Sequence, residues 1–212
     1  MIFVALALVL AIDVSGSMDN AEWDLEKLGY VQAFNSPGVV HAISDRRSVA
    51  ITIVEWSYTQ QVVVVPWRIL NSPISAASFA SEVASIRRVP MPANTSLRRA
   101  IAFSTKLLEN APFAADKNVI DISGDGAESF PEGLPIKGDA IQRGITINGL
   151  PIRGKNRYPQ DIEEYYRDYV IGGPGAFYVV ANGYEDFARA ILKKLNLELV
   201  SDATTEYRPG PY

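Results

Sequence analysis

An apolar run at the start of the chain ends in a carboxylate, and no other feature limits the possible folds as strongly. Ile2–Ile12 contains no polar side chain, and Asp13 follows it directly. A run without polar alternation is typical of a strand that is covered on both faces within a mainly parallel sheet. Such a strand carries the chain to the edge of the sheet, so we expect the groups that follow it to be presented there.

The same run is too short to cross a membrane. A spanning helix needs about 20 apolar residues, roughly twice the length of Ile2–Ile12. The run also lacks a basic region before it and a small-residue cleavage site after it. No other stretch is long and apolar enough either. We therefore expect no membrane span in this chain, and we expect any export signal to be absent from it.

The composition excludes several classes of protein. Of the 212 residues, 48% are hydrophobic and 21% are charged, which is ordinary for a soluble globular protein with a substantial core. The net charge of −4 argues against a nucleic-acid partner, which would require a basic face. With no cysteine and a single histidine, the chain has no disulfide, no thiolate site and no zinc site built from several imidazoles.

Apolar runs of strand character alternate with segments of helical periodicity along most of the chain. The expected strands are Ile2–Ile12, Val49–Val54, Gln61–Val65, Asn118–Ser123, Ile145–Leu150 and Ala176–Ala181. The expected helices are Asp19–Phe34, Ser75–Ile86, Ser96–Asn110, Pro135–Gly144, Asp161–Tyr169 and Tyr184–Leu197. This alternation predicts a Rossmann-like, doubly wound α/β fold, with helices on both faces of a mainly parallel central sheet.

One strand of that sheet is expected to be antiparallel. The short link between Val49–Val54 and Gln61–Val65 predicts an antiparallel hairpin, so one of these strands should be an antiparallel edge strand, and Pro66 is expected to end the second run. No linker rich in Gly, Ser or Pro divides the chain. We therefore expect a single domain over residues 1–200 and a flexible tail over residues 201–212.

Two acidic residues occupy matching positions after two apolar strands. Asp13 follows the first run and opens the motif Asp13-Val14-Ser15-Gly16-Ser17, and Asp125 follows Asn118–Ser123 in a glycine turn. In a doubly wound sheet, ligands bind outside the carboxyl ends of the strands. We therefore expect both carboxylates to lie at the same edge, together with a threonine, Thr95, from the loop that precedes a helix.

The candidate site therefore comprises Asp13, Ser15, Ser17, Thr95 and Asp125. All five offer hard oxygen ligands, which suit Mg²⁺, Mn²⁺ or Ca²⁺ and not zinc or copper. Two carboxylates and three hydroxyls, some acting through water, would leave one position of a magnesium octahedron open to an oxygen from outside. A threonine in this place is alternatively a helix N-cap.

This pattern resembles the von Willebrand factor A-type domain with its metal-ion-dependent adhesion site (MIDAS). That site has D-x-S-x-S after the first strand, a threonine in a second loop and an aspartate in a T-D-G or S-D-G turn after the fourth strand. The blocks Val119–Gly126, Gly144–Ile152 and Ile171–Phe177 look like an uncharacterised bacterial branch of the same fold. The resemblance implies a periplasmic or secreted protein.

The resemblance also implies a role for each residue of the site. Ser15 and Ser17 would bind the metal directly, and Thr95 would bind it directly or through water. Asp13 and Asp125 would hold metal-bound waters or enter the first shell. Two features depart from the usual pattern. Gly124 separates Ser123 from Asp125, so the turn reads S-G-D-G, and Glu128 and Ser129 stand where many members have an asparagine.

The function expected from these features is metal-dependent binding of a protein or peptide. Because neutral hydroxyls and water would leave the cation much of its charge, it would attract an Asp or Glu carboxylate of the partner. A magnesium-dependent hydrolase or phosphatase is an alternative, although Ser15 stands where a D-x-D phosphatase has its general acid. An accessory module with a vestigial metal site is a further alternative.

Two further acidic residues are expected to have structural roles and no part in the candidate site. Asp121 lies inside a predicted strand and is expected to make a buried hydrogen bond or to face a helix. Glu55 ends the Val49–Val54 run and is expected to be a surface charge on an edge strand.

Overall fold

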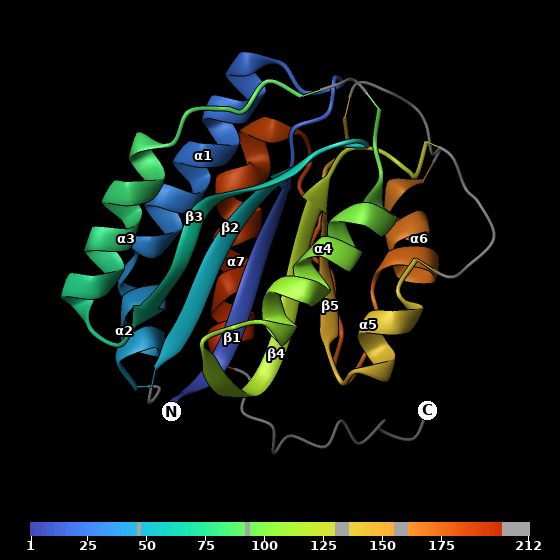
Figure 1. Ribbon diagram of the computed structural model, residues 1–212. Helices are drawn as coiled ribbons and strands as arrows, with labels where there is room; N and C mark the ends of the chain where they lie inside the picture. Colours follow the sequence, from blue (N-terminus) through green and yellow to red (C-terminus); the bar gives the residue numbers. More distant parts are fainter. Residues whose placement is uncertain (46–47, 92–93, 130–135, 155–160, 201–212) are drawn as a thin grey trace, which may run out of the picture.

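The computed structural model describes residues 1–45, 48–91, 94–129, 136–154 and 161–200. These residues form a five-stranded sheet in the order β3-β2-β1-β4-β5 (Figure 1). The strands are β1 (Ile2–Asp13), β2 (Val49–Trp56), β3 (Gln61–Leu70), β4 (Phe113–Gly124) and β5 (Thr146–Pro151). The predicted tail over residues 201–212 and part of the predicted helix Pro135–Gly144 lie outside the described residues.

The pairing of the strands confirms the predicted fold class. β1 pairs in parallel with β2 on one side and with β4 on the other, and β5 continues in parallel beyond β4. β3 is the antiparallel edge strand, paired with β2. The strand order reverses at β1, because the chain moves to one side through β2 and β3 and then returns to the other side as β4. A crevice for ligands is expected at the carboxyl end of such a strand.

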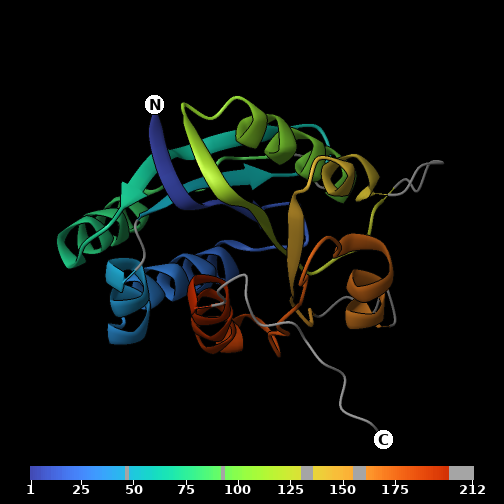
Figure 2. The same cartoon turned by 90° about the horizontal axis from the view of Figure 1, so that it is seen from below.

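Helices cover both faces of the sheet (Figure 2). One face carries α1 (Asn20–Phe34), α2 (Pro37–Asp45), α3 (Pro73–Ser85) and α7 (Phe187–Val200). The other face carries α4 (Leu97–Glu109) and α5 (Gly138–Gln142), with α6 (Ile162–Tyr165) and a π-helical turn, Tyr166–Val170, beside them. A single 3₁₀ turn, Tyr184–Asp186, leads into α7.

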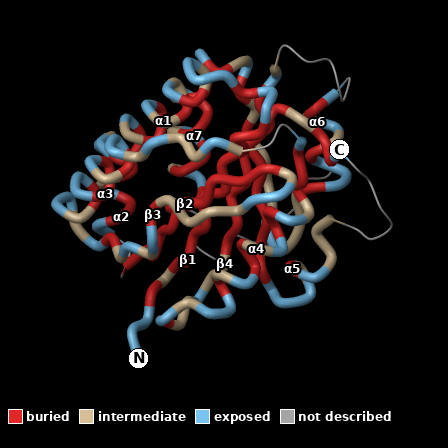
Figure 3. The backbone as a smooth tube through the Cα atoms, turned by 45° about the horizontal axis from the view of Figure 1, so that its top comes forward, coloured by how far each residue is buried: buried red, intermediate tan, exposed pale blue. Residues whose placement is uncertain are grey.

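The apolar first strand divides its side chains between two cores. Leu6, Leu8 and Leu10 pack with α1, α3 and α7, whereas Ala7 and Val9 point to the opposite face and pack with α4. All five side chains are fully buried, and Figure 3 shows the central strands as the buried part of the molecule. The absence of polar alternation in this strand therefore follows from the burial of both of its faces.

Two expectations about local structure were wrong, and one helix was not foreseen. β3 does not end at Pro66 but continues to Leu70, because Pro66 lies exposed on an edge strand, where a missing N–H is tolerated. The segment Ala176–Ala181 forms isolated bridges with the region of β5 and no ladder, after a turn that has left-handed glycines at 173 and 175. Helix α2 was not foreseen; it begins at Pro37, a residue that is favoured in the first helical turn.

None of the helices in the described ranges has the length and apolar character of a membrane span.

Candidate metal centre

The D-x-S-x-S motif forms a tight loop between β1 and α1. Asp13 is the last residue of β1, and its Oδ1 accepts a hydrogen bond of 2.8 Å from the backbone N–H of Ser15. The Val14 N–H donates to the carbonyl of Trp56 on β2 at 2.9 Å, which extends the sheet by one residue. Asp19 then caps α1 in a reciprocal capping box with Glu22. Local hydrogen bonds therefore turn the chain sharply where β1 ends.

The five candidate residues meet in one hydrogen-bonded cluster. The Thr95 hydroxyl donates to Ser15 Oγ at 3.2 Å, and Ser17 Oγ donates to Asp125 Oδ1 at 2.7 Å. The hydroxyls of Ser15 and Ser17 lie 3.4 Å apart, and Asp13 joins through the backbone of Ser15. Three loops that are far apart in the sequence thus place two carboxylates and three hydroxyls together at the carboxyl edge of the sheet.

Thr95 does not serve as the side-chain cap of α4. That role belongs to Ser96, whose Oγ accepts a hydrogen bond from the backbone N–H of Arg99. The Thr95 hydroxyl therefore remains directed at the cluster. Its backbone is fixed by the third loop, because the Thr95 N–H donates to Ser129 Oγ at 2.9 Å and the Ser129 N–H donates to the Thr95 carbonyl at 3.0 Å.

Glu128 and Ser129, which stand where many members of the resembling family have an asparagine, have a structural role. Glu128 is buried, and its Oε2 accepts a hydrogen bond of 3.0 Å from the backbone N–H of Arg98, in the first turn of α4. A carboxylate is favourable at a helix N-terminus. Glu128 and Ser129 therefore attach the loop after β4 to the start of α4.

Gly124 allows the end of β4 to approach the cluster closely. A Cβ atom at this position would lie 2.9 Å from Asp13 Oδ2 and 3.0 Å from the Tyr166 hydroxyl. Gly154 stands in a similar relation to the other carboxylate, since its Cβ would lie 3.0 Å from Asp125 Oδ2. Both carboxylates are consequently enclosed by backbone that has no side chain at the point of contact.

Burial makes the two carboxylates costly to ionise without a cation. The Asp13 side chain is buried, and its pKa is raised to about 7, first by desolvation and then by the charge of Asp125. Burial also raises the pKa of Asp125, against the hydrogen bond from Ser17. Asp13 Oδ2 has no hydrogen-bond partner within the described part of the chain. A buried, unpartnered oxygen beside a second carboxylate suits a cation.

Arg88 supports the D-x-S-x-S loop through the backbone of that loop. Nothing in the sequence pattern indicated this role. Its Nη2 donates to the carbonyls of Val14, Ser15 and Met18, at 3.2, 3.3 and 2.7 Å. Its charge also lowers the pKa of Asp13 in part. The guanidinium therefore fixes the conformation of the D-x-S-x-S loop through its backbone, and its hydrogen bonds go to carbonyls of the loop and not to the side-chain oxygens of the cluster.

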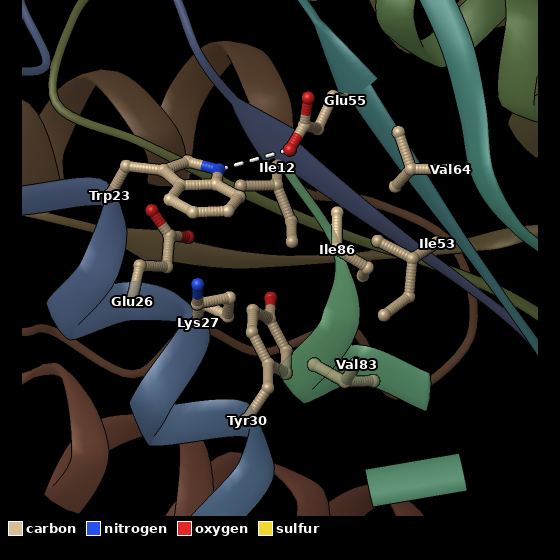
Figure 4. Close-up of a pocket in the computed structure, with 10 residues that line it drawn as sticks. All are labelled: Ile12, Trp23, Glu26, Lys27, Tyr30, Ile53, Glu55, Val64, Val83 and Ile86. Carbon is tan, nitrogen blue, oxygen red and sulfur yellow. Dashed lines mark hydrogen bonds between the residues drawn. The ribbon is translucent and has the colours of Figure 1, made fainter. Parts of the chain in front are cut away.

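Two further carboxylates lie buried near the cluster, beside a small apolar pocket between α1, β2 and α3 (Figure 4). Glu26 accepts a hydrogen bond of 2.7 Å from Ser123 Oγ, and burial raises its pKa well above the usual range. Glu55 accepts from Trp23 Nε1 at 2.9 Å and from the Val89 N–H at 2.7 Å. The expectation that Glu55 is a surface charge was wrong, because β2 is an interior strand.

Asp121 is part of a separate buried ionic network. The Lys194 ammonium, from α7, lies 2.8 Å from Asp121 and 2.6 Å from Glu198, and all three side chains are buried. Asn148 of β5 donates to Glu198 at 2.9 Å. Asp121 therefore faces a helix, as the sequence predicted, and it fastens α7 to the sheet.

The donors of the cluster fit a hard cation. Within the described ranges, no group of three or more His, Cys, Asp or Glu side chains gathers into a site. The cluster supplies two carboxylates and three hydroxyls, which suit Mg²⁺, a cation that keeps several of its waters and binds through one or two carboxylates. The unpartnered Asp13 Oδ2 is consistent with this fit.

Comparison with known proteins identifies the fold. The family model described as "Protein of unknown function (DUF1194)" matches residues 3–203. A von Willebrand factor type A protein from Catenulispora acidiphila has a similar structure, with a TM-score of 0.62 and 17% identity over 92% of this chain and 43% of that one. The vWF domain of the type V pili tip protein Mfa5 from Porphyromonas gingivalis has a TM-score of 0.63 and 9% identity, over 96% and 99% of the two chains.

A third similar structure carries a metal. Proximal thread matrix protein 1 from the mussel byssus, solved with a zinc-occupied MIDAS motif, has a TM-score of 0.62 and 12% identity, over 92% of this chain and 46% of that one. This chain thus spans less than half the length of the byssus protein and of the Catenulispora protein. No curated protein matches the sequence. At these identities, the similarity establishes the von Willebrand factor A fold.

Proposed function

The chain belongs to the DUF1194 family of proteins of unknown function, and on that premise we propose that it is a metal-dependent, adhesion-type binding module. Asp13, Ser15, Ser17, Thr95 and Asp125 hold a divalent cation, which captures an acidic side chain of a partner protein. The observation that carries this proposal is the hydrogen-bonded cluster of three hydroxyls and two buried carboxylates, in which Asp13 Oδ2 has no partner among the described residues.

The chemistry of the cluster explains the choice of an acidic partner. When bound, the cation supplies a positive charge that neutral hydroxyls and waters leave largely uncompensated. Ser15, Ser17 and Thr95 hold it through their hydroxyl oxygens, and Asp13 and Asp125 orient its waters or bind it in turn. Mg²⁺ suits this donor set best, and Mn²⁺ and Ca²⁺ use the same kinds of ligand. A carboxylate from Asp or Glu then completes the coordination.

The similar structures support a role outside the cytoplasm. One is named as the tip protein of a pilus and another as a matrix protein of the mussel byssus. We therefore place this chain in the periplasm or outside the cell, with a protein or peptide as its partner.

An enzymatic role is less well supported. A phosphatase of the D-x-D class needs a second acid two residues after its first aspartate, and that position is Ser15 here. Lys194, a buried lysine, is paired with two carboxylates and is therefore occupied in a structural ionic network. Binding, and not turnover, is accordingly the proposed activity.

The proposal is tested by metal titration and by capture of partners. We expect Mg²⁺ or Mn²⁺ to release or absorb heat on binding and to raise the melting temperature, because a ligand that binds only the folded state stabilises it. Ser15→Ala combined with Ser17→Ala should abolish both effects. The matched control is Ser81→Ala with Ser85→Ala, two exposed serines of α3.

A pull-down from native periplasmic extract with and without Mg²⁺ addresses the partner. The wild-type protein should retain proteins in Mg²⁺ and release them in EDTA, and the Ser15/Ser17 double variant should retain none of them. Recovery of the same proteins by that variant would contradict the metal bridge. Absence of any metal binding by the wild-type protein would favour an accessory module with a vestigial site.

A further inference from the structure

An arginine and a tyrosine lie together beside the metal cluster. Tyr58 follows β2 at the carboxyl edge of the sheet, and its backbone N–H donates to the carbonyl of Asn94 at 2.7 Å. The Arg99 guanidinium carbon lies 4.6 Å from the centre of the Tyr58 ring. Because Asn94 directly precedes Thr95, and Arg99 lies in the first turn of α4, this stacked pair adjoins the threonine of the cluster.

Arg99 differs from five other exposed arginines in what it contacts; Arg87, which is also exposed, has no ion pair among the described residues either. Arg68, Arg143 and Arg153 each pair with a glutamate, and Arg167 and Arg189 pair with aspartates. Arg99 is exposed, and none of the carboxylates in the described ranges lies within ion-pair distance of it. Its charge is contacted by the face of an aromatic ring, which is a weak partner at an exposed site.

The position of Arg99 is unfavourable for the isolated protein. The first turn of a helix carries the positive end of the helix dipole, so a cation there is destabilising. Arg99 places a cation where the helix dipole disfavours one, and no contact in the described part of the fold compensates for it. Such a local conflict indicates a functional constraint. The planar guanidinium is suited to bind a carboxylate through two parallel hydrogen bonds, and the Tyr58 ring holds that group in a defined place.

We propose that Arg99 binds a second carboxylate of the same partner segment whose first carboxylate is held at the metal cluster. The inference rests on the proposed function and specifies its ligand as a peptide segment with two acidic side chains. A second carboxylate is involved because the guanidinium is stacked on Tyr58 and makes no hydrogen bond to the cluster. Arg88, in contrast, is the cation that acts on Asp13.

The spacing expected between the two acidic residues of the partner peptide follows from the separation of Thr95 and Arg99 at the start of α4. One turn of helix rises about 5.4 Å, and an extended peptide advances about 3.3 Å per residue. Thr95 and Arg99 are four residues apart, across the start of α4. Two glutamates that are adjacent, or separated by one or two residues, would therefore reach the cluster and Arg99 together.

The test uses short labelled peptides of glycine and glutamate in Mg²⁺. One peptide has a single glutamate, and three others have two glutamates separated by zero, one or two glycines. Dissociation constants are measured by NMR titration for the wild-type protein, Arg99→Gln and Arg99→Lys. Lys106→Gln is the matched control, because Lys106 is an exposed cation further along the same helix. Melting curves establish that each variant is folded.

We expect at least one two-glutamate peptide to bind the wild-type protein about five-fold more tightly than the single-glutamate peptide, as a favourable ion pair at the protein surface allows. Arg99→Gln should lose this advantage and bind the single-glutamate peptide as the wild type does. Arg99→Lys should keep part of it, and Lys106→Gln should keep all of it.

Two results overturn the inference in distinguishable ways. If the single-glutamate peptide binds in Mg²⁺ but a second glutamate brings no advantage, or brings one that survives in Arg99→Gln, the role of Arg99 is wrong and the metal-dependent function stands. If no peptide binds in Mg²⁺ beyond its binding in EDTA, the proposed function and the role of Arg99 fail together.

Discussion

Replacing Asp13 by asparagine should stabilise the metal-free protein and abolish its response to magnesium. The substitution removes a buried negative charge and keeps the shape of the side chain. An asparagine Oδ1 can still accept the hydrogen bond that the Ser15 N–H donates at 2.8 Å. The amide nitrogen would replace Oδ2, an atom that has no hydrogen-bond partner among the described residues. Gly124 lies close to this atom, since a Cβ on Gly124 would come within 2.9 Å of it.

The size of the effect follows from the pKa of Asp13. Burial and the charge of Asp125 raise it from 3.8 to about 7. At 1.36 kcal/mol per pKa unit, ionised Asp13 costs the folded state up to about 4 kcal/mol. Because the pKa of Asp13 is raised on folding, the folded state binds the proton more tightly than the unfolded state does, and protonation stabilises the fold. The metal-free wild type should therefore lose stability as the pH rises from about 4 to about 7, and change little above that range.

Urea denaturation in EDTA, at pH 5 and at pH 8, measures this difference. Asp13→Asn should be more stable than the wild type by a few kcal/mol at pH 8, and the gap should narrow at pH 5. Addition of Mg²⁺ at 100 times its dissociation constant should stabilise the wild type by about 2.7 kcal/mol and leave the variant unchanged. If Asp13→Asn is less stable than the wild type in EDTA at pH 8, the carboxylate is not an uncompensated charge and the electrostatic argument for a cation is refuted.

Two other substitutions test the surroundings of the site. Lys194→Met leaves two buried carboxylates without their cation, so it should destabilise the protein by about 3–5 kcal/mol in urea denaturation; Lys193→Met, at an exposed position, should change stability by less than about 0.5 kcal/mol. Equal effects of the two changes would argue against the ionic network. Gly124→Ala introduces a Cβ 2.9 Å from Asp13 Oδ2 and should weaken Mg²⁺ binding at least about ten-fold in calorimetry. Gly126→Ala is the control, because its Cβ would lie 3.6 Å from the Thr95 hydroxyl, an ordinary contact, and the change should have little effect.

The residues of the cluster were recognisable from the sequence because local rules determine their positions. Asp13 and Asp125 each follow a strand whose apolar character is visible in the chain, and parallel strands end at one edge of a sheet. The role of Thr95 could not be decided in this way. Thr95 and Ser96 are both reasonable caps for α4, and the hydrogen bond from Arg99 to Ser96 leaves the Thr95 hydroxyl to the cluster.

Other residues were missed because their surroundings come from distant parts of the chain. Glu55 looked like a surface charge, since its strand seemed to lie at an edge, but β3 covers one side of that strand and β1 the other. Arg88 supports the D-x-S-x-S loop through three backbone carbonyls, and backbone groups leave no trace in the pattern of side chains. Pro66 appeared to end a strand because its tolerance at an edge depends on which side of β3 is paired.

The sequence by itself determined the doubly wound fold and the group of oxygen-bearing side chains at its edge, because hydrophobic periodicity and turn residues act within short stretches. The tertiary structure decided which charges are buried and which are paired. Lys194 acquires its role from Asp121, on a strand more than 70 residues earlier, and Arg99 is defined by the ring of Tyr58. Such roles depend on the local dielectric and on contacts between elements that are distant in the sequence, and both exist only once the chain has folded.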